Sequence, residues 1–211
     1  MKRSRVRLDV DERRAQLVEL GLAEFGTRSF DEVSIDLLAE RARISKGLLY
    51  HYFPNKRAFY VACLEEAAGR LVARLDAVST EGSPLDHLVR AVDAYLAHVR
   101  GHGRAFATLM RGGIGQGREI AEVVDRTREA LVERLTQRLA EVIPAVAIDL
   151  APPLLQVALR GWIGFAEAAS IAWVEATIAA ENDPARAVPE TAAVRDVIVR
   201  ALVATVQQAA G

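Results

Sequence analysis

SIDLLAERARISKGLLYHYFPNK, residues Ser34–Lys56, decides how the rest of this 211-residue chain is interpreted. The stretch predicts two short helices joined by a tight turn. Ser34 and Ser45 are each placed to cap a helix, since a serine hydroxyl accepts a hydrogen bond from a backbone amide in the first turn. Pro54 cannot extend the second helix, because its ring removes an amide donor and clashes with the preceding turn. Two short helices with so brief a connection indicate a helix-turn-helix, whose second helix is narrow enough to enter the major groove of DNA.

A more specific pattern lies in the second half of this stretch and in the residues around it. The pattern consists of Ser45–Phe53 (SKGLLYHYF), Asn55–Lys56 and, upstream, Phe25, Gly26 and Phe30. With these residues the chain resembles the TetR family of bacterial one-component regulators. The resemblance implies an all-α chain, with an N-terminal helix-turn-helix DNA-binding domain and a C-terminal helical domain for ligand binding and dimerisation. It also implies a cytoplasmic homodimer that binds a double-stranded DNA operator and responds to a small-molecule effector.

The resemblance also assigns DNA contacts to individual positions. Tyr50 and His51 offer hydrogen bonds to the duplex, and Lys46 and Lys56 offer positive charge to phosphates. The amides at the start of the helix that Lys56 opens form a further anion site, because they lack intrahelical partners. Outside this motif, each of these side chains would be interpreted as a solvated polar residue. The residues predicted to contact DNA are Ser34, Arg43, Ser45, Lys46, Leu48, Tyr50, His51 and Lys56.

Three positions depart from the family pattern. Leu48 stands where a small or hydroxyl residue is common, and it can read no more than a thymine methyl group. Arg43 occupies the turn position usually held by glycine, where a left-handed backbone costs an arginine roughly 1–2 kcal/mol, so the turn is open to a different shape. Asp36 favours the helix dipole but repels DNA if it faces the duplex. These departures bear on the operator sequence and not on DNA binding itself.

The composition is that of an ordinary globular protein, with 51% hydrophobic and 26% charged residues. It lacks the alternation of β-branched and aromatic residues that is typical of strands, which favours an all-helical fold. No run of eighteen or more apolar residues occurs, so neither a membrane span nor any membrane partner is expected. The basic N-terminus has no apolar segment, so no signal peptide is expected. The single cysteine, Cys63, excludes an intramolecular disulfide and fits a reducing cytoplasm.

The net charge of −1 would not by itself suggest a DNA-binding protein. The distribution is more informative, because residues 1–60 hold 12 Lys and Arg against 9 Asp and Glu. This asymmetry is modest, so specific phosphate contacts must contribute more than overall attraction. The basic residues at positions 1–8 are consistent both with a disordered tail and with a flexible arm on phosphate or in a minor groove.

Turn-rich residues divide the chain into a small DNA-reading domain and a larger domain. The predicted division is residues 1–56 for the N-terminal arm and helix-turn-helix, 57–78 for a connecting helix, and 79–211 for effector binding and dimerisation. The first helix should begin at a capping box, Asp9–Glu12, and end at Gly26. Gly21 within this helix is interpreted as a position where the helix packs closely against the two helices of the helix-turn-helix. Asn55 should cap the connecting helix, and further helices are predicted near residues 84–99, 105–110, 119–142, 154–181 and 190–209.

The helices of the larger domain carry a set of mostly aromatic side chains, whose simplest interpretation is that they form a hydrophobic core. In the family that the chain resembles, these helices surround an effector cavity, and an aromatic lining with few polar groups suits an apolar or amphipathic ligand. The residues predicted to line it are Tyr95, Phe106, Met110, Trp162, Phe165 and Glu167. Glu167 and Arg160 are either orienting groups for a ligand or residues that face solvent or a partner subunit.

The last two helices carry more apolar surface than one subunit should cover. The helix near residues 154–181 is apolar on most sides, so we expect it to be buried on most sides. We expect Trp173, Val197, Ile198 and Ala201 to be buried against their symmetry mates in a homodimer.

Two other classes of function are alternatives to a repressor that a small molecule releases from DNA. A helical enzyme would need a nucleophile and base or a metal set, and the four histidines are scattered. His98 and His102 are spaced to share a metal on one helix face, but no cysteine or carboxylate completes the set, so neither a metal nor a cofactor is expected. An architectural DNA-binding protein without an effector remains the other alternative.

Overall fold

The computed structural model describes residues 10–102, 117–142 and 152–209, and every regular element in these ranges is a helix. The expected all-α fold is therefore confirmed. The helices are α1 (Val10–Thr27), α2 (Ile35–Ala42), α3 (Lys46–Tyr52), α4 (Lys56–Asp76), α5 (Pro84–Gly101), α7 (Arg118–Val142), α8 (Pro152–Asn182) and α9 (Thr191–Ala209). The helix predicted near residues 105–110 lies outside the described residues.

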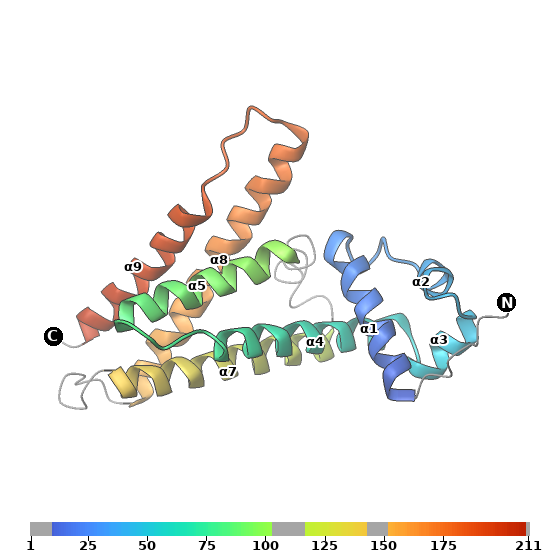
Figure 1. Cartoon of the computed structure of the whole chain (residues 1–211), viewed down its shortest axis with the longest axis horizontal. Helices are drawn as coiled ribbons and strands as arrows, with labels where there is room; N and C mark the ends of the chain where they lie inside the picture. Colours follow the sequence, from blue (N-terminus) through green and yellow to red (C-terminus); the bar gives the residue numbers. More distant parts are fainter. Residues whose placement is uncertain (1–9, 103–116, 143–151, 210–211) are drawn as a thin grey trace.

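The helices form a small head at one end of an elongated molecule (Figure 1). Helices α1, α2 and α3 make up the head, and α4 leads away from it alongside α7 (Figure 1). Helix α5 lies above this pair, and α8 and α9 form a hairpin that projects away from it (Figure 1). The arrangement makes α4 the direct connection between the head and the remaining helices.

Side-chain caps position the helices of the head as the sequence predicts. The hydroxyl of Ser34 accepts from the amide of Leu37 at 3.0 Å, and the hydroxyl of Ser45 accepts from the amide of Leu48 at 3.1 Å. The side chain of Asn55 caps α4 in the same way. These caps satisfy amides that have no partner within the helix, which is why the three boundaries were predictable.

The turn between α2 and α3 keeps a left-handed residue although it contains no glycine. Arg43 has φ 54° and ψ 44°, and its amide donates to the carbonyl of Glu40 at 3.0 Å. The amide of Ile44 donates to the carbonyl of Ala39 at 3.0 Å, so the backbone closes the helix end. The left-handed conformation of Arg43 thus occurs despite its cost of roughly 1–2 kcal/mol.

The head has an apolar core to which α4 contributes as many buried residues as α1 does. It includes Leu17, Phe25, Leu38, Leu49, Phe53, Phe59, Tyr60 and Cys63. Ile120, near the start of α7, belongs to the same core and is 2% exposed. A Cβ atom on Gly21 would lie 2.6 Å from Phe59 Cζ and would also clash with Cys63 Sγ. Close packing at Gly21 is therefore present, but against α4 and not against the reading helices.

A second apolar core joins α5, α8 and α9. Its buried members include Val92, Leu96, Val99, Trp173 and Ile198. Because Trp173 and Ile198 are buried within the chain itself, the prediction that they form a dimer surface is wrong. Their indole and alkyl groups already pack among neighbouring helices of the same subunit.

Helix α8 is more exposed than its composition suggested. Val157 is 68% exposed and Phe165 is 42% exposed, so the expectation that this helix is buried on most sides is wrong for the single chain. Its segment Leu154–Asn182 is also long and apolar enough to cross a membrane, judged by length and composition. Core helices of soluble proteins meet the same criterion, and α8 packs on α7, α9 and α5.

Candidate nucleic-acid interface and ligand cavity

Helix α3 presents an exposed polar side that is held in place by a buried anchor. Leu49 is buried in the core of the head, whereas Leu48, Tyr50 and His51 are exposed. A seven-residue helix anchored by one leucine can offer its remaining side to a groove without losing its packing. Of the residues predicted to contact DNA, Ser34, Arg43, Ser45, Lys46, Leu48, Tyr50 and His51 are exposed, and Lys56 is half-buried.

Lys46 forms an ion pair across the helix-turn-helix. Its ammonium lies 2.9 Å from Oδ1 and 3.0 Å from Oδ2 of Asp36. The hydrogen bond that Lys46 donates to Asp36 and the charge of that carboxylate raise the pKa of Lys46. Asp36 thus points towards α3 and neutralises the lysine that the sequence assigned to phosphate contact.

Lys56 also has partners within the head. Its ammonium lies 4.3 Å from the centre of the Phe30 ring and 3.5 Å from the carbonyl oxygen of Asp31. The cation therefore joins the start of α4 to the loop between α1 and α2. The caps and these contacts leave the exposed side of α3 as the part of the head with the most groups available to DNA.

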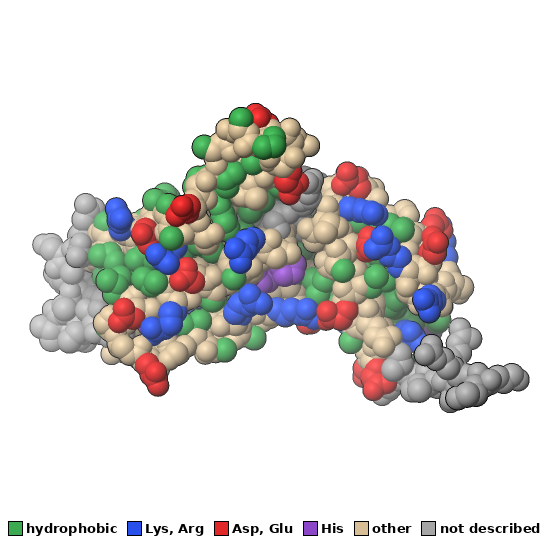
Figure 2. All heavy atoms as spheres, turned by 45° about the horizontal axis from the view of Figure 1, so that its top comes forward, with side chains coloured by type: hydrophobic (Ala, Val, Ile, Leu, Met, Phe, Trp, Pro, Cys, Tyr) green, Lys and Arg blue, Asp and Glu red, His purple; other side chains and the backbone are tan. Residues whose placement is uncertain are grey.

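Positive and negative side chains are mixed over the described part of the face shown in Figure 2. This agrees with the modest excess of basic residues in the N-terminal third of the sequence. Sequence preference in protein–DNA complexes comes from contacts to base edges and from DNA shape, not from overall charge.

The sequence reasoning missed a buried carboxylate beneath the helix-turn-helix. Glu24 on α1 is 3% exposed and pairs with Arg41 on α2 and, at 3.6 Å, with Arg28. A buried acid is stabilised only when it is paired, so this network fixes α2 against α1. The spacing along α1 could have revealed this residue. Glu24 lies three residues after Gly21 and seven after Leu17, which places it on the buried side of the helix.

A cavity of about 360 Å³ lies between the head and the second core. It is bordered by α1, α4, α5, α7 and α8, with one residue from α9. Apolar side chains predominate, among them Leu22, Phe25, Leu64, Ala67, Leu71, Val92, Val123, Leu131 and Ile163. The volume falls within the range of about 300–1,000 Å³ that is typical of small-molecule sites.

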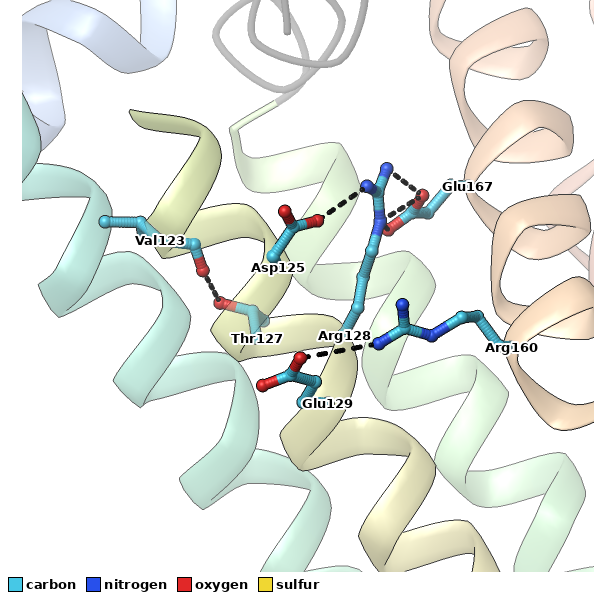
Figure 3. Close-up of polar contacts among 7 residues, drawn as sticks. All are labelled: Val123, Asp125, Thr127, Arg128, Glu129, Arg160 and Glu167. Carbon is cyan, nitrogen blue, oxygen red and sulfur yellow. Dashed lines mark hydrogen bonds and ion pairs between the residues drawn. The ribbon is translucent and has the colours of Figure 1, made fainter. Parts of the chain in front are cut away.

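Three of the six residues predicted to line a cavity do so, namely Tyr95, Trp162 and Glu167. Phe165 does not, and that prediction is wrong because the side of α8 that carries it faces outwards. Phe106 and Met110 lie outside the described residues. Arg160 is not a lining residue either, and its guanidinium lies 3.6 Å from Glu129 on α7 (Figure 3).

Most polar groups in the cavity already have partners. Trp162 donates its indole N–H to the carbonyl of Ile198 at 2.9 Å. Glu167 accepts three hydrogen bonds from Arg128, at 2.7, 3.0 and 3.1 Å (Figure 3). The buried hydroxyl of Tyr95 has no hydrogen-bond partner within the part of the chain that the structure describes. Ser170 is close enough to act on the pKa of Tyr95, but the two hydroxyls lack hydrogen-bond geometry, and burial raises that pKa overall.

The imidazole of His98 lines the same cavity as an uncharged group. Burial lowers its pKa to about 4, with further contributions from His102 and Arg74. The rings of His98 and His102 lie 4.7 Å apart. Within the described ranges, no group of three or more His, Cys, Asp and Glu side chains could hold a metal ion.

Ion pairs connect α4 to α7 along the side of the cavity. Arg126 on α7 lies 3.0 Å from Glu65, and Arg134 lies 2.8 Å from Asp76. The hydrogen bond from Arg134 lowers the pKa of Asp76. These ion pairs join α7 to α4, which begins in the head.

The fold and the arrangement of α3 define a helix-turn-helix transcriptional regulator. The family model described as "Bacterial regulatory proteins, tetR family" matches residues 17–63. The model described as "Tetracyclin repressor-like, C-terminal domain" matches residues 84–205. The chain belongs to the tetR family, whose members are DNA-binding regulators and not enzymes. Such regulators are soluble and typically cytoplasmic.

Individual relatives agree with this assignment. The transcriptional regulator AcuR of Cereibacter sphaeroides is 30% identical over 163 residues, which are 71% of each chain. The transcriptional activator FasR of Mycolicibacterium smegmatis is 27% identical over 128 residues, which span 60% of this chain and 58% of that relative. A crystal structure of a tetR-family regulator from Streptomyces coelicolor has a TM-score of 0.78 and 32% identity, covering 94% of this chain and 82% of that one.

Proposed function

We propose that this chain is a cytoplasmic homodimeric repressor that a small apolar or amphipathic effector releases from a palindromic operator. The observation that carries the proposal is the position of the cavity. It touches α1 of the head through Leu22 and Phe25 and follows α4 as far as Asp76. A molecule in it would contact both the reading head and the helix that connects the head to the remaining domain.

The ion pairs between α4 and α7 support a mechanism in which ligand binding moves α4 and, with it, the head. Helix α4 starts at its cap in the head, and α7 is joined to it by Arg126–Glu65 and Arg134–Asp76. A ligand that separates α7 from α5 would tilt α4 and change the spacing of the two recognition helices in a dimer. Equal affinity for both spacings would shift nothing, so the ligand must prefer the spacing that does not fit the operator.

The size of the cavity is sufficient for such a preference. To shift the dimers from mostly the DNA-binding spacing to mostly the non-binding spacing, the ligand must bind the non-binding state about 10⁴-fold more tightly, or by roughly 5.5 kcal/mol. At about 25 cal/mol per Å² this corresponds to roughly 220 Å² of apolar surface buried in one state and not in the other. The mainly apolar lining is consistent with contacts on this scale.

Exposed apolar side chains on α8 and α9 support the homodimer. Leu154, Val157 and Phe165 are exposed on α8, and Val197 is exposed on α9. Packing these two helices against their symmetry mates would form a four-helix interface with two-fold symmetry. The operator would then be a pseudo-palindrome, read by Tyr50 and His51 of each protomer.

The test combines footprinting of the operator, a screen for small molecules that release it, and two variants of α4. Ala67→Phe places a phenyl ring in the cavity, whereas Ala73→Phe adds the same ring to an exposed, non-lining position of the same helix. We expect a two-fold symmetric footprint, and effector release in the wild type and in Ala73→Phe but not in Ala67→Phe. Release of Ala67→Phe at the wild-type effector concentration would refute the cavity as the effector site. Failure of every molecule to release the operator would favour an architectural DNA-binding protein.

A further inference from the structure

We infer that the cavity takes an uncharged, largely apolar molecule with one hydrogen-bonding group, and that this group binds the hydroxyl of Tyr95. The inference rests on the proposed function and narrows it from an apolar or amphipathic effector to one chemical class. Two independent features carry it. One is an unsatisfied buried hydroxyl, and the other is the pairing of every charged group in the lining.

Among the described residues, the hydroxyl of Tyr95 is the buried side-chain polar atom of the cavity lining that has no hydrogen-bond partner. It is buried, and no acceptor or donor in the described structure meets it with hydrogen-bond geometry. Leaving such a group unpaired costs free energy that a partner would recover. The neighbouring Ser170 hydroxyl donates to the carbonyl of Ala166 at 2.7 Å, so it has no proton to offer Tyr95, and its oxygen does not meet the Tyr95 hydroxyl with hydrogen-bond geometry. A ligand hydroxyl or carbonyl would complete the site.

The charged side chains of the lining leave no free counter-ion. Among the described residues, each Asp, Glu and Arg that lines the cavity is in an ion pair. The pairs are Asp76–Arg134 (2.8 Å), Glu141–Arg138 (2.9 Å) and Glu167–Arg128 (2.7 Å). A charged ligand would have to break one of them or enter the cavity unpaired, and both alternatives are costly.

His98 does not supply the missing charge. Burial lowers its pKa to about 4, so the imidazole is neutral at neutral pH. It offers a ligand neither a cation nor an anion. Trp162 likewise adds apolar surface without a free donor, because its N–H is bound to Ile198. The interior end of the cavity therefore favours a neutral molecule.

A matched series of ten-carbon probes tests the inference by calorimetry without DNA. The probes are 1-decanol, decanoate and decylammonium, each kept below its aggregation concentration at neutral pH. We expect 1-decanol to bind at least about tenfold more tightly than either ion, since only the ions must be desolvated without a partner. Equal or tighter binding of decanoate or decylammonium would overturn the inference, and so would the absence of 1-decanol binding.

Two variants separate the hydroxyl from the charges. Tyr95→Phe should weaken 1-decanol binding by about 2- to 12-fold, the range for one neutral hydrogen bond, and leave decanoate binding unchanged. Its unfolding temperature without ligand should not fall, because the variant removes an unpaired hydroxyl. Glu167→Gln should tighten decanoate binding several-fold, because Arg128 then keeps only its longer pair with Asp125, at 3.4 Å, and the effect on 1-decanol should be small. Wild-type affinity of Tyr95→Phe for 1-decanol, or of Glu167→Gln for decanoate, would count against the assignment.

The outcomes distinguish this inference from the proposed function. If the operator screen yields a charged effector, the regulator responds to ligand but the inferred class of neutral molecules is wrong. If 1-decanol binds with the predicted dependence on Tyr95 and no molecule releases DNA, the class stands and the effector-released repressor is wrong.

Discussion

Replacing Asp36 with Asn should steepen the salt dependence of DNA binding. In the wild type the ammonium of Lys46 lies 2.9 Å from the Asp36 carboxylate and is neutralised before it meets DNA. The variant frees this cation for a phosphate, and each added phosphate contact changes the slope of log K against log salt by about −0.9. Raising the salt from about 50 to about 200 mM should then weaken the variant about 3.5-fold more than the wild type.

Fluorescence anisotropy on a labelled operator and on a random duplex, at four salt concentrations, measures both slopes. The matched control is Lys46→Met, and Asp36→Asn added to it should have no further effect on the slope if the two residues act as a pair. Because both partners are exposed, the fold should be unaffected by the change. Parallel slopes for wild type and Asp36→Asn would show that Lys46 does not reach a phosphate when it is free.

Two further predictions concern stability. Gly21→Ala should lower the free energy of unfolding by about 1–2 kcal/mol, since overpacking against Phe59 and Cys63 outweighs roughly 1 kcal/mol of helix propensity. An unchanged denaturation midpoint would contradict the close approach of α1 and α4. The folded chain protonates His98 near pH 4 and the unfolded chain near pH 6.5, so the folded state binds fewer protons between these values and stability should fall as pH is lowered through this window. Urea midpoints measured across it should depend less on pH in His98→Asn, and an identical pH dependence in both proteins would refute the assignment.

The features that sequence reasoning located correctly are those set by neighbours in the chain. The caps at Ser34, Ser45 and Asn55 each involve an amide three residues away. Such contacts form within one helical turn, so the residue types at fixed spacing are sufficient to predict them. The same locality explains why α3 could be placed with its polar side chains exposed.

The features that sequence reasoning missed depend on how helices rotate against one another. Phe165 and Trp162 are three residues apart on an apolar helix, and composition alone does not tell which of them faces the cavity. Likewise, the sequence spacing of Asp36 and Lys46 does not predict that α2 and α3 bring these two side chains together. The left-handed Arg43 shows that the residue type alone did not predict the turn, because backbone hydrogen bonds to Glu40 and Ala39 close the end of α2 in this conformation.

Ile120 has a consequence for the order in which the chain acquires its structure during synthesis. The core of the head closes with this α7 residue, yet it lies 44 positions after the last residue of α4, Asp76. At about 5–20 residues per second, translation from Asp76 to Ile120 takes roughly 2–9 s. For that time the nascent head emerges with an apolar gap on its surface. The core of the head is therefore completed only after the first residues of α7 have been synthesised.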